Sequence, residues 1–188
     1  MGLFDDWHHC PRCGAEIVPA DGRAECAPCG YIAYANPAPA VCALLVDGDG
    51  RILLTRRRWE PYAGMWDLPG GFLAEEEHPL DGLRRELLEE TGLEVEPADW
   101  FGAFLVPYGD GPGTRTVLNL VWLARVVGGT ARAADDVSEL GWFGRDELPP
   151  MEEVAMAEPL ERWLQSGAAR HAGRIGKGSD PKGQSPRS

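Results

Sequence analysis

The chain has 188 residues, 44% of them hydrophobic, which suits one domain with its own core and a small appendage rather than two full-sized domains. Its formal net charge of -12 disfavours nucleic-acid binding, because that affinity comes mainly from Lys and Arg at phosphates. No apolar run reaches the roughly 18 to 20 residues that span a bilayer, and the first ten residues do not resemble a signal peptide, so we expect a cytoplasmic protein.

Residues 1–36 contain two cysteine pairs with the same spacing, Cys10/Cys13 and Cys26/Cys29, each followed by glycine. A two-residue spacer lets both sulfurs of a pair reach one ion, and four thiolates complete the closed tetrahedral shell of a structural zinc site. The pattern predicts a zinc ribbon whose folding depends on Zn²⁺. Two redox-active pairs are the alternative, which the lack of a thioredoxin-like βαβ context disfavours.

After a proline-rich linker at 36–39, the apolar pattern predicts the elements of a larger domain. We expect a hairpin of strands 41–46 and 51–55 around the turn 47–50, and then a short extended segment at 66–69. A helix should begin near Pro79 and end at Gly92. Strands at 100–107, 116–127 and 140–143 and an amphipathic helix at 152–165 complete the domain. The irregular alternation predicts an α+β fold with a mixed sheet.

Residues 166–188 have a different composition, rich in Gly, Ser and Pro, with five Lys or Arg against one Asp. Such a segment has little to bury, so we predict a disordered basic tail; electrostatic tethering to an acidic surface is the alternative. The predicted division is a zinc ribbon at 1–36, the main domain at 37–165 and the tail at 166–188.

The helix 79–91 carries a cluster of acids. Glu86, Glu89 and Glu90 occupy positions i, i+3 and i+4, so their side chains share one face. A leucine stripe beside them would anchor the helix to the sheet: Leu80, Leu83 and Leu87. The carboxylates repel one another, and a hard cation such as Mg²⁺ or Mn²⁺ would remove that repulsion, orient a diphosphate and activate water. An ordinary solvated helix face is the alternative from these residues alone.

Residues 71–93 resemble the Nudix box, G-x5-E-x7-R-E-U-x-E-E-x-G-U, at every fixed position. The matching residues are Gly71, Glu77, Arg85, Glu86, Glu89, Glu90 and Gly92, with Leu87 and Leu93 at the aliphatic positions. The resemblance spans about residues 38–165. It implies the Nudix fold, a mixed α/β sheet sandwich, and a Mg²⁺- or Mn²⁺-dependent hydrolase that cuts the diphosphate linkage of a nucleotide.

The resemblance also assigns roles within the box. Glu86, Glu89 and Glu90 match the metal-binding glutamates, and Gly71 supplies a backbone carbonyl. Glu77 matches an auxiliary acid. Arg85 matches the arginine that orients the carboxylates. The predicted catalytic residues are therefore Glu77, Arg85, Glu86 and Glu89. Either Glu86 or Glu89 is the general base, and the sequence leaves that choice open.

A zinc ribbon before a Nudix box resembles the arrangement of NADH pyrophosphatases, but the Ser-Gln-Pro-Trp-Pro-Phe-Pro array that follows the box in those enzymes is missing here. The expected substrate is therefore a class: ADP-ribose, NADH or a related nucleotide. Candidate substrate contacts are Trp66 and Tyr108, whose rings could stack on a base, and Glu139 as a further acid, with Asp136 as the alternative. Other aromatic candidates are Trp59, Tyr62 and Phe101.

The alternative function is a non-catalytic nucleotide sensor or adaptor whose ribbon contacts a macromolecule. The intact glutamates favour turnover, and residues 1–36 hold two Arg against five acids, a weak endowment for nucleic-acid contact. The expected partner is a small nucleotide. We expect no membrane and no nucleic acid, and leave a homodimer open.

Overall fold

The computed structural model describes residues 3–4, 6–109 and 114–166. Its helices are α1 (Pro79–Thr91) and α2 (Ala157–Ser166), with a 3-10 turn at Met151–Glu153. Its strands are β1 (Arg23–Glu25), β2 (Ile32–Tyr34), β3 (Ala38–Leu45), β4 (Ile52–Arg57), β5 (Trp66–Asp67), β6 (Gly70–Phe72), β7 (Leu93–Tyr108), β8 (Arg115–Gly129) and β9 (Val137–Phe143).

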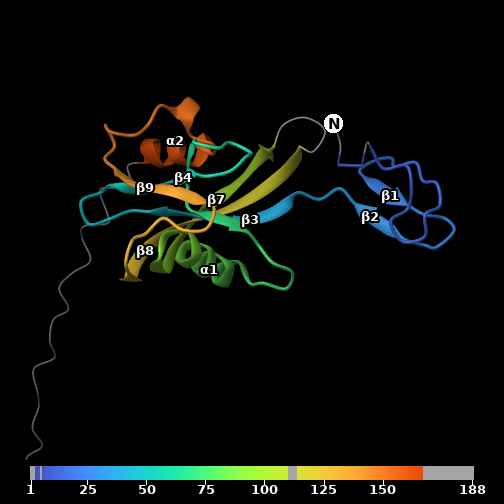
Figure 1. Ribbon diagram of the computed structural model, residues 1–188, viewed down its shortest axis with the longest axis horizontal. Coiled ribbons are helices and arrows are strands. Elements are labelled where there is room, and N and C mark those ends of the chain that lie inside the picture. The colour runs from blue at the N-terminus through green and yellow to red at the C-terminus, as the bar shows by residue number, and fades with distance from the viewer. Residues whose placement is uncertain (1–2, 5, 110–113, 167–188) are drawn as a thin grey trace, which may run out of the picture.

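The described strands form three sheets, with the orders β6-β3-β8-β7, β5-β4-β9 and β1-β2. The pair β3–β8 is parallel and the other pairs are antiparallel. In Figure 1, α1 and α2 lie on opposite sides of the two larger sheets, while β1 and β2 form a small unit set apart at the N-terminal end. Mixed sheets flanked by helices confirm the α+β prediction.

The central strand β3 is buried on both faces. Val41, Ala43 and Leu45 pack into a core cluster with Leu83 and Leu87 of α1. The alternate residues belong to a second cluster, with α2, which contains Cys42, Leu44, Leu160 and Trp163. Because successive strand side chains point to opposite faces, a strand between two cores has to be apolar throughout. The continuous apolar run at 41–46 follows from this position.

The expected hairpin at 41–55 is wrong in its pairing. The turn exists, since the Asp47 amide donates to the Arg51 carbonyl at 2.9 Å. Past the isolated bridge between Val46 and Ile52, however, β3 pairs with β6 and β8, and β4 pairs with β5 and β9. Both strands are buried on two faces, so each lies at the centre of its own sheet instead of beside the other.

Helix α1 begins and ends where the sequence predicts. The His78 ring nitrogen Nδ1 caps it by accepting from the Leu80 amide at 3.3 Å. Gly92 closes it with a φ of 69° and donates its amide to the Leu88 carbonyl at 2.9 Å, the left-handed ending that glycine favours. Leu83 and Leu87 are fully buried, so the predicted leucine stripe does anchor the helix to the sheet.

The final helix starts later than predicted. Val154 is in extended conformation and bridges Trp66, and the following Ala155 amide donates to the Trp66 carbonyl at 2.8 Å. Helix α2 begins only at Ala157, with Pro159 in its first turn, where a missing amide hydrogen costs nothing. The helix still has one packed face, since Leu160 and Trp163 are both fully buried.

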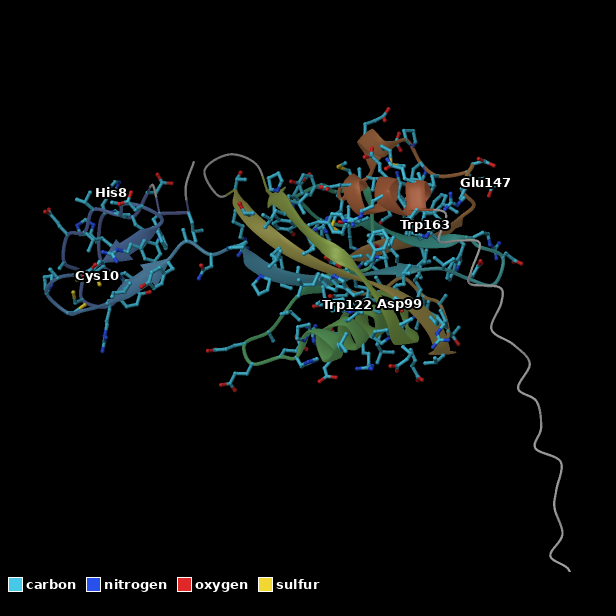
Figure 2. All side chains as sticks on the ribbon, turned by 180° about the vertical axis from the view of Figure 1, so that it is seen from behind. His8, Cys10, Asp99, Trp122, Glu147 and Trp163 are labelled. Atoms are coloured by element: carbon cyan, nitrogen blue, oxygen red, sulfur yellow. The ribbon has the colours of Figure 1, made fainter. Side chains whose placement is uncertain are left out.

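The small N-terminal unit has its own core, formed by Phe4, Cys10, Ile17, Ala24 and Cys26. Figure 2 shows His8 and Cys10 in this unit, apart from Trp122 and Trp163 of the main domain. None of the helices in the described residues is long and apolar enough to cross a membrane. The segment predicted as a tail lies, from residue 167 on, outside the described residues.

Replacing Leu87 with alanine should destabilise the domain by about 2–5 kcal/mol, because the fully buried side chain would leave a cavity between α1 and the sheet. Its neighbour Leu88 is 50% exposed, so Leu88→Ala should change stability by about 0.5 kcal/mol or less. Urea unfolding of both variants tests the packing of α1. Equal losses would contradict it.

Candidate functional site

The four paired cysteines converge. Their sulfur atoms all lie within 4.8 Å of one another, with 3.7 Å between Cys10 and Cys29 and 3.5 Å between Cys13 and Cys26. A tetrahedral zinc ion with Zn–S bonds of about 2.3 Å requires sulfur separations of about 3.8 Å. His8 and His9 are exposed and not part of this group. The quartet therefore has the dimensions of a zinc ribbon site.

Each pair sits on the same backbone turn. The Gly14 amide donates to the Cys10 carbonyl at 2.9 Å, and the Gly30 amide donates to the Cys26 carbonyl at 2.8 Å. Both glycines have positive φ, 74° and 70°, which a side chain would make costly. Burial tends to raise the pKa of the Cys10 thiol, but the amides of Arg12 and Cys13 and the neighbouring thiols lower it to about 7.

A second site is a cavity of about 260 Å³ in the main domain. One part of its wall is acidic: Asp67, Glu86, Glu90, Asp135 and Asp136. Another part is aromatic, from Tyr62, Phe72 and Tyr108. Its floor includes Cys42 and Asn119 of the neighbouring parallel strands β3 and β8. The cavity thus combines acids with planar apolar surfaces.

Glu90 is the deepest of these acids, with 6% of its surface exposed. Its Oε2 accepts a hydrogen bond from the Gly70 amide at 2.9 Å. Burial raises its pKa well above the usual range, and the nearby carboxylates of Asp136, Glu86 and Asp67 act in the same direction. A buried carboxylate among acids is costly unless a cation joins it.

Arg85 binds three glutamates of the box. It donates from Nε and Nη2 to both carboxylate oxygens of Glu77, at 2.7 and 2.8 Å, and from Nη1 to Glu86 at 2.8 Å and Glu89 at 3.0 Å. The hydrogen bonds from Arg85 lower the pKa of Glu77 to about 2, helped by the Ala74 amide. This arginine fixes the box carboxylates in place.

The three predicted metal-binding glutamates are near one another but are not one tight group. Among the described residues, the four cysteines form a group whose ligand atoms all lie within 4.8 Å of one another, and the three glutamates do not form such a group. Arg85 holds Glu86 and Glu89, whereas Glu90 turns to Gly70. Glu86 lines the cavity with a side chain 13% exposed, whereas the Glu89 side chain is 49% exposed and outside the lining.

Gly71 is pressed against the acids as the box pattern requires. A Cβ at this position would lie 2.6 Å from the carboxylate carbon of Glu86. Gly71 also pairs with Val41 on β3. A side chain at this position would therefore displace the Glu86 carboxylate from its present place.

Two of the predicted substrate contacts lie elsewhere. Trp66 is 9% exposed and packs in the core against Phe143, with ring centroids 4.9 Å apart, so it is not available for stacking on a base. Glu139 forms an exposed ion pair with Arg56 at 3.2 Å and does not line the cavity, whereas Asp136 does. The strand β9 turns the Glu139 side chain toward Arg56 of its partner β4.

Tyr108 does line the cavity, as predicted, and Arg57 holds it there. Arg57 Nη2 donates to the Tyr108 hydroxyl at 3.0 Å, and Nη1 contacts Asp67 at 3.4 Å. Burial raises the pKa of Asp67 to about 6 although Arg57 opposes the shift. Among the stacking candidates, Tyr62 also lines the cavity; Trp59 is exposed and Phe101 packs against the core.

Sequence reasoning missed several cavity residues: Arg57, Asp67, Phe72 and Asn119. Asn119 left a signal, because it is a polar residue inside the apolar run of β8. Phe72 directly follows the glycine pair at 70–71, and Asp67 precedes it by three residues. Nothing in the local sequence marks either one as a cavity residue. Their role depends on which strands pair across the sheet.

A family model described as the NUDIX domain matches residues 36–164. The ADP-ribose pyrophosphatase of Methanocaldococcus jannaschii is 35% identical over 121 residues, which is 64% of this chain and 70% of that protein. The NAD-capped RNA hydrolase NudC of Pseudomonas aeruginosa is 28% identical over 145 residues, 76% of this chain and 49% of that protein. The chain therefore spans about half the length of this second relative.

Solved structures agree with the sequence match. A NUDIX hydrolase from Nitrosomonas europaea superimposes with a TM-score of 0.69 and 26% identity, covering 85% of this chain and 92% of that one. The family match includes α1, both larger sheets and the acidic cavity. Together with the complete box on α1, this shows that the chain belongs to the Nudix family.

Proposed function

We propose that this Nudix domain is a divalent-metal-dependent hydrolase that cuts the diphosphate linkage of a nucleoside-diphosphate-linked substrate. The observation that carries the proposal is the buried Glu90 carboxylate beside Glu86 at an open cavity. A site that only bound a nucleotide would have no reason to keep acids where a diphosphate must approach. With a cation between them, the same acids become favourable for that approach.

The donor set fits a hard cation. Glu86, Glu89 and Glu90 would hold Mg²⁺ or Mn²⁺ together with the Gly71 carbonyl, since carboxylate and carbonyl oxygens suit these ions. Burial, together with the neighbouring carboxylates, raises the pKa of Glu90, and a cation at this place would favour the charged carboxylate. When bound, the metal neutralises diphosphate charge and makes its water more acidic.

The cavity geometry favours Glu86 as the base that takes a proton from the attacking water. Glu86 lines the cavity, whereas Glu89 is half exposed beside it. Burial raises the pKa of Glu86, although Arg85 opposes the shift, and a base works best with a pKa closer to neutral pH. Arg85 and Glu77 are then positioning residues that orient Glu86 and Glu89.

The substrate class that we propose is ADP-ribose, NADH or a related small nucleotide. Relatives of this chain include an ADP-ribose pyrophosphatase and NAD-capped RNA hydrolases. The net charge of -12 would repel a long RNA more than a dinucleotide. Tyr108 and Phe72 offer faces for a base, with ring centroids 5.4 Å apart.

For the small unit we propose a structural Zn²⁺ on Cys10, Cys13, Cys26 and Cys29, with the ribbon ending near residue 36 and the hydrolase domain spanning 37–165. Four free thiols held at metal-binding distance suit a reducing compartment such as the cytoplasm. The basic tail at 166–188 and a homodimer stay predictions.

The central test is hydrolysis of ADP-ribose, NADH, NAD-capped RNA and nucleoside triphosphates with Mg²⁺ or Mn²⁺. Glu90→Gln and Glu86→Gln should each lower kcat/KM by at least about a hundredfold, because metal stabilisation of the transition state is worth several kcal/mol. Exposed Glu75 provides the control, and Glu75→Gln should retain activity. Nucleotide binding with no metal-dependent product from any substrate would instead support the sensor.

Arg85→Lys keeps the positive charge but loses the two-pronged contact with Glu77. We expect Mn²⁺ affinity or kcat to fall by about 10- to 100-fold, the usual cost of losing a group that orients metal ligands. Neighbouring Arg84 pairs with exposed Asp81 and Glu96, so Arg84→Lys should change neither quantity. Equal activity of the two variants would contradict the positioning role of Arg85.

Purified protein should carry about one zinc ion per chain, measured by elemental analysis. Cys26→Ser should lose the zinc and unfold the ribbon, because metal binding supplies much of the folding free energy of so small a unit. Cys42→Ala should retain the zinc, since Cys42 lies in β3 and outside the quartet. Retention of zinc by Cys26→Ser would overturn the assignment.

A further inference from the structure

Asn119 is a buried polar residue that the metal chemistry does not explain. It is 7% exposed and stands on β8 between the buried residues Val117 and Val121, which share its face of the sheet. A buried polar group without full hydrogen bonding destabilises the fold. An apolar residue would continue the pattern and would avoid that cost.

Cys42 fixes the orientation of the Asn119 amide. The Cys42 thiol donates to Asn119 Oδ1 at 3.5 Å, across the parallel pair β3–β8. One lone pair of Oδ1 is therefore directed at the thiol, and the Nδ2 end carries two N–H donors. Within the described part of the chain, no acceptor is hydrogen-bonded to Nδ2. Nδ2 is also not one of the fully buried nitrogen or oxygen atoms that lack a partner, so part of its surface is accessible. The free donors therefore open onto the cavity.

The amide lines the same cavity as two aromatic rings. Ala40 on β3 pairs with Asn119 on one side and with Phe72 on the other, so all three side chains share the cavity face. The Phe72 and Tyr108 rings form its aromatic wall. The Tyr108 hydroxyl accepts from Arg57 at 3.0 Å, which leaves its own hydrogen free to donate. This side of the cavity offers hydrogen-bond donors beside aromatic faces.

We propose that Asn119, held by Cys42, determines specificity by donating an N–H to a ring carbonyl of the substrate's heterocycle. The inference rests on the proposed function and names the group that the site selects. Because Oδ1 is turned toward the Cys42 thiol, the amide presents its Nδ2 donors, rather than its acceptor, to the cavity. The cavity therefore favours a nucleotide whose ring edge carries an oxo group over one with an amino group at the same place.

The test compares ADP-ribose with inosine diphosphate ribose, which replaces the 6-amino group by a 6-oxo group. Wild-type protein should show the lower KM for the oxo substrate. Asn119→Leu, close in size, should raise KM for the oxo substrate by about three- to tenfold, the usual effect of one neutral hydrogen bond. The effect on KM for ADP-ribose should be smaller, so the ratio of the two KM values is the readout. Asn119→Asp should reverse the preference, since a carboxylate accepts from an amino group.

Cys42 is a positioning residue, and a double-mutant cycle tests it. Cys42→Ala should raise KM for the oxo substrate in the wild-type background and have no further effect in Asn119→Leu. A purely structural role for Cys42 would change both substrates alike and would persist without Asn119. That result would overturn the coupling.

Calorimetric binding of the two nucleotides without divalent metal separates this inference from the proposed function. If the chain hydrolyses none of the substrates in the central test, the proposed function fails, and the binding preference still decides the role of Asn119. If wild-type protein does not prefer the oxo nucleotide, or if Asn119→Leu keeps the wild-type preference, the inference is overturned.

Discussion

The carboxylate of Glu90 is the constraint around which the main domain is arranged. It is buried among other acids and has the Gly70 amide as its hydrogen-bond donor. That amide can reach it only because Gly70 has a φ of 147° and no Cβ, which would lie 2.0 Å from the Val41 carbonyl. The acid, the glycine and the central strand are thus fitted to one another. Displacing any of them would move the others.

The same strand connects the two halves of the cavity. Helix α1, which carries the acids, packs on one face of β3. On the other face of the same strand, Ala40 and Cys42 line the cavity. Pairing with β6 brings the glycines of the box, and pairing with β8 brings Asn119. A cavity of mixed chemistry therefore depends on one strand with long-range partners on both sides.

Local features were predictable because local rules determine them. The limits of α1 follow from Pro79 and Gly92, and the clustering of the four cysteines follows from their spacing. What failed depended on distant contacts. The turn at 47–50 suggested a hairpin, yet the two strands enter different sheets because both are buried on two faces. Trp66 looked like an available aromatic, but Phe143 on β9 covers it.

The cavity residues show the same limit. The box predicts three glutamates on one helical face. Only the tertiary structure shows that two of them bond to Arg85 and the third to the Gly70 amide. Arg57 and Asn119 are separated from the box by long stretches of chain, and strand pairing alone brings them to it.

The N-terminal unit shares no core residue with the two clusters of the main domain among the described residues. Two units with separate cores have no reason to melt together, and the zinc dependence that we propose for the smaller one would separate them further. Heating or denaturant would then produce two transitions, each with its own midpoint, and a single free energy of unfolding would describe neither.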